Sequence, residues 1–264
     1  MSIDYDIYFQ SVTKGLNQTS HLQFYKAETF PTISPIYWLK SHFAVGAYSP
    51  LERLSGMLTA HMTQIAPRNG FQWHPHRWLE IYTYVIEGQL YHEDTIGSSG
   101  VITAGEVQRM YSGHYIEHQE LNLTNEFTRV IQIWFLVEPE YRNPEPQYEQ
   151  VKLADMPVHK IQDGLVREII GPSRVTNSHV NARLTNTIVP AGGQTTVELP
   201  RPDEDLFLYI TDGQGQIQAN SFSESVNLYD VVLATPNAKA PTLTAGDKPL
   251  NFLSFYLKSF MNLN

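Results

Sequence analysis

The sequence predicts an all-β protein of the sandwich or barrel type, and two patterns in its 264 residues support this. Short runs of β-branched and aromatic residues recur along the chain, separated by Gly, Pro and Asn. No stretch shows strong helical periodicity. The hydrophobic fraction of 42% is enough to build a sizeable core. We therefore expect strands throughout, connected by turns.

The first half contains a series of candidate strands. Residues 1–50 contain mixtures of aromatic and polar side chains, for example at 36–50, which suit short strands with irregular packing. The segment 94–100 reads as a hairpin turn and not as a phosphate-binding loop, because no helix start follows it. The candidate strand runs after residue 56 are 57–67, 73–88, 89–94, 100–113 and 126–139.

A linker is predicted next, because residues 138–150 carry three prolines and few apolar side chains. Strand-like runs then resume at the spacing of a second sandwich or barrel. We therefore divide the chain into domains at 1–140 and 141–264. The runs of the second half are 165–171, 180–190, 194–200, 206–213, 215–219, 226–234 and 250–258.

Charge and composition exclude several classes of protein. Lys and Arg number 18 against 27 Asp and Glu, a net charge of -9, so we expect no direct binding to nucleic acid. The absence of cysteine excludes disulfides and thiolate metal sites. Residues 1–12 lack the pattern of a secretory signal, and no run reaches membrane-spanning length. We expect a cytoplasmic protein that does not bind membranes.

Two i, i+2 pairs point to a metal site in the first half. His74 and His76 form one pair, and His118 and Glu120 form the other. Side chains alternate across a strand, so both members of a pair face the same side. Two such strands side by side would bring three imidazoles and one carboxylate to a common point. That composition suits Fe(II), Mn(II), Ni(II), Cu(II) or Zn(II).

Glu80 competes for the carboxylate role, because its parity matches that of His74 and His76 if residues 73–88 form one strand. It would then orient a histidine, take a proton, or lie at the surface of a strand end. The other histidines carry less weight. We interpret His92 as a turn residue, find no strand logic for His114, take His21, His42 and His61 as structural, and find no such pair around His159 and His179.

The chain resembles the pirin family of bicupins. The resemblance rests on HPHR at 74–77, TYVIEG at 83–88, HEDTIG at 92–97, Met110-x-x-Gly113 with the preceding AGE, and IEHQE at 116–120. HFAVGAY at 42–48 and PQYEQ at 146–150 add to it. The family's metal ligands fall on the four residues of the two pairs, which favours Glu120 over Glu80.

The resemblance implies two face-to-face antiparallel β-barrels of the double-stranded β-helix or jelly-roll type, with the metal only in the first. The ion expected is Fe(II), with Mn, Ni, Co, Cu or Zn as alternatives. It also implies a quercetin 2,3-dioxygenase type of activity on a flavonol or related aromatic enol, in which Glu120 is both ligand and base and dioxygen cleaves the heterocycle with release of carbon monoxide. The alternative is a non-catalytic, metal-binding regulatory or protein-interaction module.

The chain departs from the family pattern beside the predicted ligands. Trp78 stands where a glycine is usual, His114 and Tyr115 replace an Arg-Gly or similar pair, and Glu117 replaces an apolar residue. Trp78 would share the parity of the ligands. Trp78, His114 and Tyr115 are therefore candidate pocket residues, whose rings would either stack on a flat polyphenol or exclude it.

Overall fold

The computed structural model describes residues 21–173 and 175–261, and it confirms the all-β prediction. The segment read for a targeting signal, residues 1–12, lies outside these residues. No helix in the described part of the chain is long and apolar enough to cross a membrane. The helices of this part are three short 3-10 turns: η1 (Ala27–Thr29), η2 (Pro139–Tyr141) and η3 (Leu153–Asp155).

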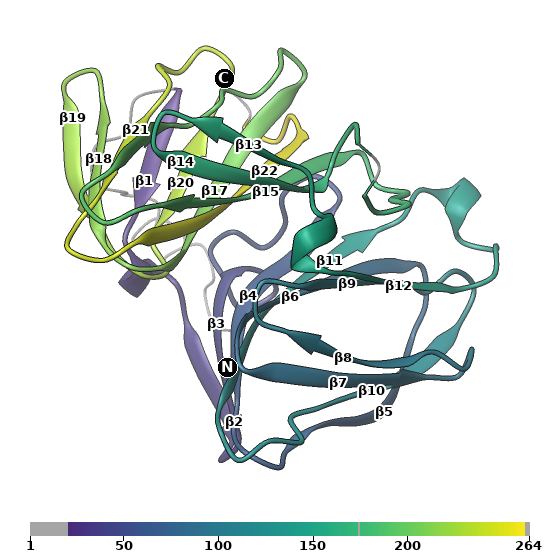
Figure 1. Cartoon of the computed structure of the whole chain (residues 1–264). Coiled ribbons are helices and arrows are strands. Elements are labelled where there is room, and N and C mark those ends of the chain that lie inside the picture. The colour runs from purple at the N-terminus through teal and green to yellow at the C-terminus, as the bar shows by residue number, and fades with distance from the viewer. Residues whose placement is uncertain (1–20, 174, 262–264) are drawn as a thin grey trace, which may run out of the picture.

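The first half of the molecule is built from one seven-stranded and one four-stranded antiparallel sheet (Figure 1). The seven-stranded sheet has the order β12 (Gln147–Val151), β9 (Val107–Tyr111), β6 (Leu79–Glu87), β11 (Thr128–Leu136), β4 (Met57–Ile65), β3 (Leu39–Val45) and β2 (Thr32–Ile36). The four-stranded sheet has the order β5 (Gly70–His76), β10 (Ile116–Leu121), β7 (Gln89–Asp94) and β8 (Ser99–Thr103).

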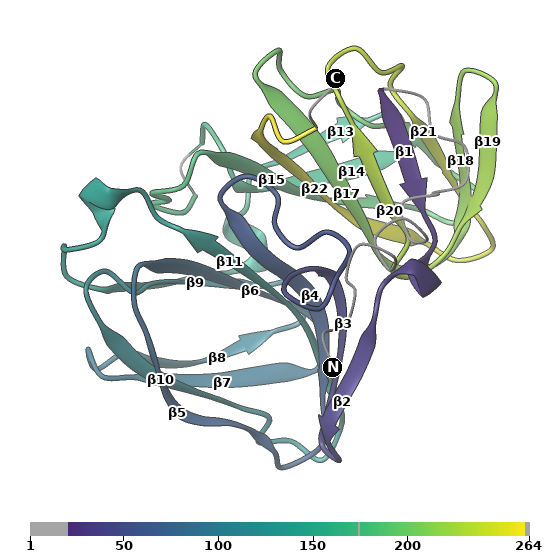
Figure 2. The same ribbon diagram turned by 180° about the vertical axis from the view of Figure 1, so that it is seen from behind.

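The second half repeats this arrangement, as Figure 2 shows from behind. Its seven-stranded sheet has the order β1 (Leu22–Tyr25), β20 (Val231–Ala234), β17 (Glu204–Asp212), β22 (Leu250–Lys258), β15 (Ala182–Val189), β14 (Gly164–Ile170) and β13 (Val158–Ile161). Its four-stranded sheet has the order β16 (Gln194–Thr196), β21 (Thr242–Ala245), β18 (Gly215–Ala219) and β19 (Phe222–Val226).

Each half is a jelly roll of two facing sheets and not a barrel closed by hydrogen bonds. Two strands cross the predicted division of the chain. The early strand β1 pairs with β20 of the second half, and β12, from the predicted linker, pairs with β9 of the first. The domain boundary at residue 140 stays a prediction.

The two halves meet through their seven-stranded sheets, while the four-stranded sheet of the first half lies away from the second half (Figures 1 and 2). One apolar cluster joins the two. It contains Tyr82 and Phe135 from the first half with Phe207 and Phe255 from the second, all at most 2% exposed. Burial of this much aromatic surface favours a fixed association of the halves.

Alternation along the central strands decides which residues reach the inside of the first jelly roll. On β6, Tyr82 and Tyr84 face the second half, whereas Ile81 and Val85 belong to clusters inside the first half. Thr83 lies between these two and shares their parity, so it also points inward. The same rule places Gln108 of β9 and Gln132 of β11 inside.

Candidate metal centre

Three histidines meet where the ends of two paired strands run side by side. His74 and His76 lie on β5 and His118 lies on β10, where His118 stands opposite His74. One candidate ligand atom from each of the three lies within 4.8 Å of the others. The ring centroids are 4.4–4.9 Å apart. Strand parity and pairing thus bring together three of the four predicted ligands, whose role as ligands stays a prediction.

The free ring nitrogens of this cluster suit a metal ion. The Nδ1 atom of His74 lies 2.7 Å from the carbonyl oxygen of Gln72, so it carries the proton and Nε2 keeps a lone pair. The Nε2 atom of His118 is buried and has no hydrogen-bond partner among residues 21–173 and 175–261. Burial, with the nearby His74, lowers the pKa of His76 to about 4. Burial also lowers the pKa of His118. The imidazoles of His76 and His118 are therefore neutral at pH 7, as metal binding requires.

Glu120 is buried beside this cluster but is not part of the three-histidine group. Its candidate ligand atom lies within 4.8 Å of those of His118 and His92, which form a second group. The amides of Gln108 and Gln132 both donate to its carboxylate, the latter at 2.5 Å, and Thr83 donates at 3.1 Å. In the pairing of β10 with β5, the register shifts between His118 and Glu120.

Gly70 makes this register shift sterically possible. A β-carbon added there would lie only 2.3 Å from the carbonyl oxygen of Glu120. Only glycine lets the start of β5 approach β10 so closely. The glycine at position 70 is therefore needed for the close approach of the two strands at Glu120, the predicted carboxylate ligand.

The interpretation of His92 as a turn residue is wrong. His92 lies on strand β7, is fully buried, and its Nε2 atom is 3.0 Å from a carboxylate oxygen of Asp94. The ring of Tyr148 stacks on it at 4.3 Å. Burial would raise the pKa of Asp94, but hydrogen bonds from His92 and from the Ser98 N–H lower it below its usual value.

Sequence reasoning missed several residues that surround the cluster. His92 and Asp94 form a third i, i+2 pair, which was hidden because the segment was read as a turn. Gln108 and Gln132 gave a signal in the sequence, since each is a polar residue inside a predicted strand with the parity of an apolar neighbour, Met110 or Val130. Trp134, whose ring lies 5.1 Å from that of His76, gave no comparable signal.

The polar groups form a belt inside the jelly roll, between two apolar clusters. We define the belt as Thr83, His92, Gln108, Glu120 and Gln132 with the three histidines. On one side lie Val85, Leu90 and Val130, and on the other Ile81, Met110 and Ile116. The belt is therefore shielded from water on both sides, which strengthens its electrostatic interactions.

Glu80 lies elsewhere, because the run predicted as one strand is two. β5 ends at His76, Trp78 adopts a left-handed φ of 61°, and β6 begins at Leu79 in a different sheet. The parity argument that linked Glu80 to the histidines is therefore wrong. Its place beside Tyr82 turns it toward the second half of the molecule.

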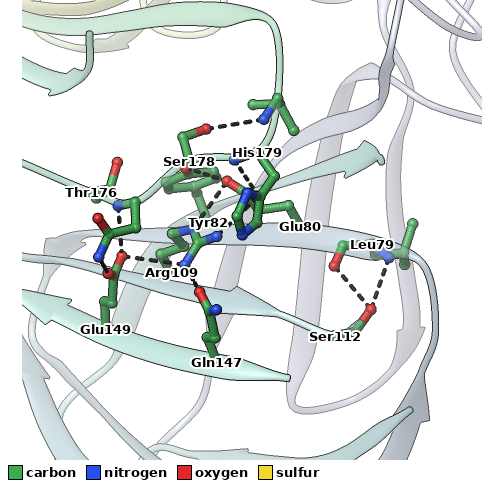
Figure 3. A network of polar contacts seen from close by, with 12 residues as sticks. Leu79, Glu80, Tyr82, Arg109, Ser112, Gln147, Glu149, Thr176, Ser178 and His179 are labelled. Carbon is green, nitrogen blue, oxygen red and sulfur yellow. Dashed lines mark hydrogen bonds and ion pairs between the residues drawn. The ribbon is translucent and has the colours of Figure 1, made fainter. Parts of the chain in front are cut away.

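The carboxylate of Glu80 is instead paired with a fully buried arginine (Figure 3). Arg109 donates to both oxygens of Glu80, at 3.0 and 3.2 Å, and lies 3.3 Å from Glu149. Tyr82 and the backbone N–H of His179 also donate to Glu80, at 2.6 and 2.9 Å. This network links the second half to the first. Both carboxylate oxygens of Glu80 accept hydrogen bonds within it.

The predicted pocket residues differ in position. Trp78 is 44% exposed with the guanidinium of Arg142 over its ring, so it does not project into the interior as predicted. His114 is exposed and hydrogen-bonds to the backbone of Pro144. Tyr115 is half-buried.

The hydroxyl of Tyr115 donates to Glu117, and the guanidinium of Arg77 lies 4.8 Å from the centre of its ring. These polar partners hold the tyrosine ring at the ends of β5 and β10.

The second half has the same strand order but an apolar interior. Leu243 of β21 and Ile217 of β18 are fully buried, in the sheet that corresponds to the one carrying the histidines. Within residues 21–173 and 175–261, both groups of potential metal ligands lie in the first half.

Two jelly rolls joined by their larger sheets, with a histidine cluster inside one, define a bicupin. Comparison with known proteins refines this class. Residues 37–135 match the family model named Pirin. This match confirms the resemblance to pirins seen in the sequence.

Curated relatives agree with this assignment. A Pseudomonas aeruginosa protein named "Putative quercetin 2,3-dioxygenase" is 42% identical over 115 residues, which cover 42% of this chain and 49% of the relative. Pirin-like protein 2 of Arabidopsis thaliana is 32% identical over 179 residues, covering 65% and 55%. The matches thus span about half the length of these relatives.

Solved structures share the fold. The bacterial pirin YhhW of Escherichia coli, in complex with nickel(II), has a TM-score of 0.73 at 23% identity and covers 90% of this chain and all of its own. A quercetin 2,3-dioxygenase of Acinetobacter baumannii has a TM-score of 0.71 at 17% identity, covering 86% and 83%.

Proposed function

We propose that the first half binds one divalent transition metal through His74, His76 and His118, with Glu120 as the fourth ligand. The observation that carries this proposal is the buried Nε2 atom of His118, which lies in the three-histidine group and has no hydrogen-bond partner among the residues that the structure describes. An unpaired polar atom in a protein interior costs free energy unless something binds it. The nickel(II) complex of YhhW, a protein of the same fold, supports the binding of a divalent metal.

Iron(II) is the ion we propose, with Mn, Ni, Co, Cu and Zn as alternatives that the donor set also accepts. A bound iron(II) would supply Lewis-acid and one-electron redox chemistry toward an enol and dioxygen. We further propose a quercetinase type of dioxygenase activity on a flavonol or related aromatic enol, in the cytoplasm. The names of the compared proteins from Pseudomonas and Acinetobacter support this activity.

Glu120 is suited to take the proton of the substrate hydroxyl. A carboxylate has about four lone-pair positions, and the donors from Thr83, Gln108 and Gln132 fill three of them. One position is left, so the carboxylate would bind the metal and accept the proton one after the other and not at the same time. The two amides hold the carboxylate in place, which favours proton transfer over a fixed distance.

The test starts with the metal content of the purified protein. Metal-free protein is reconstituted anaerobically with each candidate ion and exposed to oxygen with a flavonol. We expect loss of flavonol absorbance together with release of carbon monoxide, and at least a 100-fold slower reaction for Glu120→Gln, since positioned acid-base groups contribute about 10²–10⁴-fold. If none of the ions supports turnover of the flavonol, the dioxygenase proposal is refuted.

The second candidate is a metal-binding module that interacts with another protein. Burial favours it, because His118 and Glu120 are each only 1% exposed. It predicts metal-dependent capture of a protein partner without turnover. If a partner binds the His74→Ala variant as tightly as the wild type, the interaction does not depend on the metal.

A further inference from the structure

We infer that His92 and Asp94 are positioning residues that select the tautomer of His118, so that its Nε2 atom presents a lone pair to the metal. The inference rests on the proposed metal position. In this proposal His92 and Asp94 do not bind the metal themselves. They set the protonation of the ligand His118.

Three side chains form a hydrogen-bonded row. A carboxylate oxygen of Asp94 lies 3.0 Å from Nε2 of His92, and Nδ1 of His92 lies 3.5 Å from Nδ1 of His118. An ionised carboxylate only accepts, so Nε2 of His92 must carry the proton. In a neutral ring Nδ1 of His92 is then the acceptor, and Nδ1 of His118 must be the donor. This leaves the lone pair of His118 on Nε2.

The result agrees with an independent feature of the same ring. Nε2 of His118 is a buried atom without a hydrogen-bond partner in the described part of the chain, and it belongs to the residue shared by both groups of potential metal ligands. A lone pair at that position is what a metal requires, whereas an N–H would be a buried donor with nothing to bind.

Water cannot readily replace the partners in this row. The side chains of His92 and Asp94 are both 0% exposed, and the ring of Tyr148 covers one face of His92 at 4.3 Å with an interplanar angle of 14°. A substitution at Asp94 should therefore change the protonation of His92 and His118, because water is not available to replace the lost hydrogen-bond partner.

The turn after β7 fixes the orientation of Asp94. Its Oδ1 atom accepts hydrogen bonds from the backbone N–H groups of Ile96 and Ser98, at 3.1 and 2.9 Å, and only Oδ2 faces His92. In Asp94→Asn the amide oxygen must stay on these two N–H groups. The amide NH₂ then faces Nε2 of His92, which has to become an acceptor.

This single substitution should reverse both tautomers. With Nε2 of His92 accepting, its Nδ1 is protonated and donates toward His118. Nδ1 of His118 then accepts, and the proton moves to Nε2, where it blocks the metal. The fold around the turn keeps the hydrogen bonds of Ile96 and Ser98.

Long-range ¹H–¹⁵N correlation spectra of the metal-free wild type at mildly alkaline pH test the row without any substitution. We expect His92 protonated at Nε2 and His118 at Nδ1. Asp94→Asn should show the opposite tautomers and bind Ni(II) and Co(II) at least 10-fold more weakly in equilibrium titrations, the range typical for groups behind a metal ligand.

Glu93→Gln is the matched control, because it makes the same chemical change one residue away on the other face of β7. Its side chain contacts Tyr91 and Gln119, and we expect wild-type tautomers and wild-type Kd values. A wild-type His118 protonated at Nε2, or a His92 protonated at both nitrogens, overturns the inference. So does a folded Asp94→Asn protein with unchanged tautomers and unchanged Kd.

These outcomes separate the inference from the proposed function. Predicted tautomers and a weakened Kd without flavonol turnover would refute the dioxygenase and keep the positioning role. Turnover by the wild type with the wrong tautomer at His118 would do the reverse.

Discussion

Replacing Arg109 by methionine should destabilise the protein more than any surface substitution. Arg109 is fully buried and gives its guanidinium to Glu80, also fully buried, and to Glu149. Removing one partner of a buried ion pair leaves an uncompensated charge, which costs about 3–5 kcal/mol. Tyr82 and the His179 N–H still donate to Glu80. We therefore expect a loss near the lower end, about 3 kcal/mol.

Urea unfolding of a double-mutant cycle measures this pair. Arg109→Met and Glu80→Gln should each be strongly destabilising, and the double variant should recover about 2–3 kcal/mol relative to their sum. Lys152→Met is the control, because Lys152 is 53% exposed in its ion pair with Glu106 and should lose less than about 1 kcal/mol.

Hydrogen exchange locates the effect. The backbone N–H groups of Asn177 and His179 donate to Glu149 and Glu80, so they should exchange faster in Arg109→Met than in the wild type. A loss no larger than that of Lys152→Met, or unchanged exchange at both amides, would show that the arginine does not hold the two halves together.

The remaining predictions concern single positions. Gly70→Ala should cost about 2 kcal/mol in urea unfolding, since its β-carbon would lie 2.3 Å from a backbone oxygen, whereas Gly56→Ala, with its nearest contact at 3.8 Å, should cost little. Burial lowers the pKa of His61 to about 4. As the pH falls from about 6.5 to 4, His61 is therefore protonated in the unfolded chain before it is protonated in the folded one. The free energy of unfolding then drops by up to about 1.4 kcal/mol per pH unit. The variant His61→Gln should show a smaller slope when unfolding is measured across this pH range. Trp78→Gly should change stability by less than about 1 kcal/mol, because relief of the left-handed backbone offsets the lost contacts of a half-exposed ring; a loss of about 3 kcal/mol, typical of a core tryptophan, would contradict this.

The sequence was sufficient to predict strands and to bring the histidines together. Parity within a strand is a local property, so His74 and His76 could be placed on one face from their spacing alone. The pairing of β5 with β10 followed from the second i, i+2 pair, and the structure sets His118 opposite His74. Gln108 and Gln132 share the strand parity of Met110 and Val130, but Gln132 has apolar neighbours on both faces, so alternation alone does not place it inside.

The sequence could not show where a strand ends. The backbone turn at Trp78 separates β5 from β6 and moves Glu80 into another sheet, although no glycine or proline marks the break. The pairing of Glu80 with Arg109 and the second half is a long-range contact, which spacing does not encode. His92 was missed for the related reason that a hairpin strand and its turn have similar composition.

The contrast between the halves argues that the polar belt serves a ligand and not the fold. The same strand order supports a second interior in which Leu208, Ile217 and Leu243 pack as an ordinary apolar core. A jelly roll of this kind therefore does not need polar groups inside, and burying them costs free energy unless each is paired. In the first half Glu120 is paired by two amides and a hydroxyl. Among the described residues, however, Oε1 of Gln108 has no hydrogen-bond partner, and neither has Nε2 of His118. A metal at that atom would offset the cost, which makes metal binding the step on which every other functional claim depends.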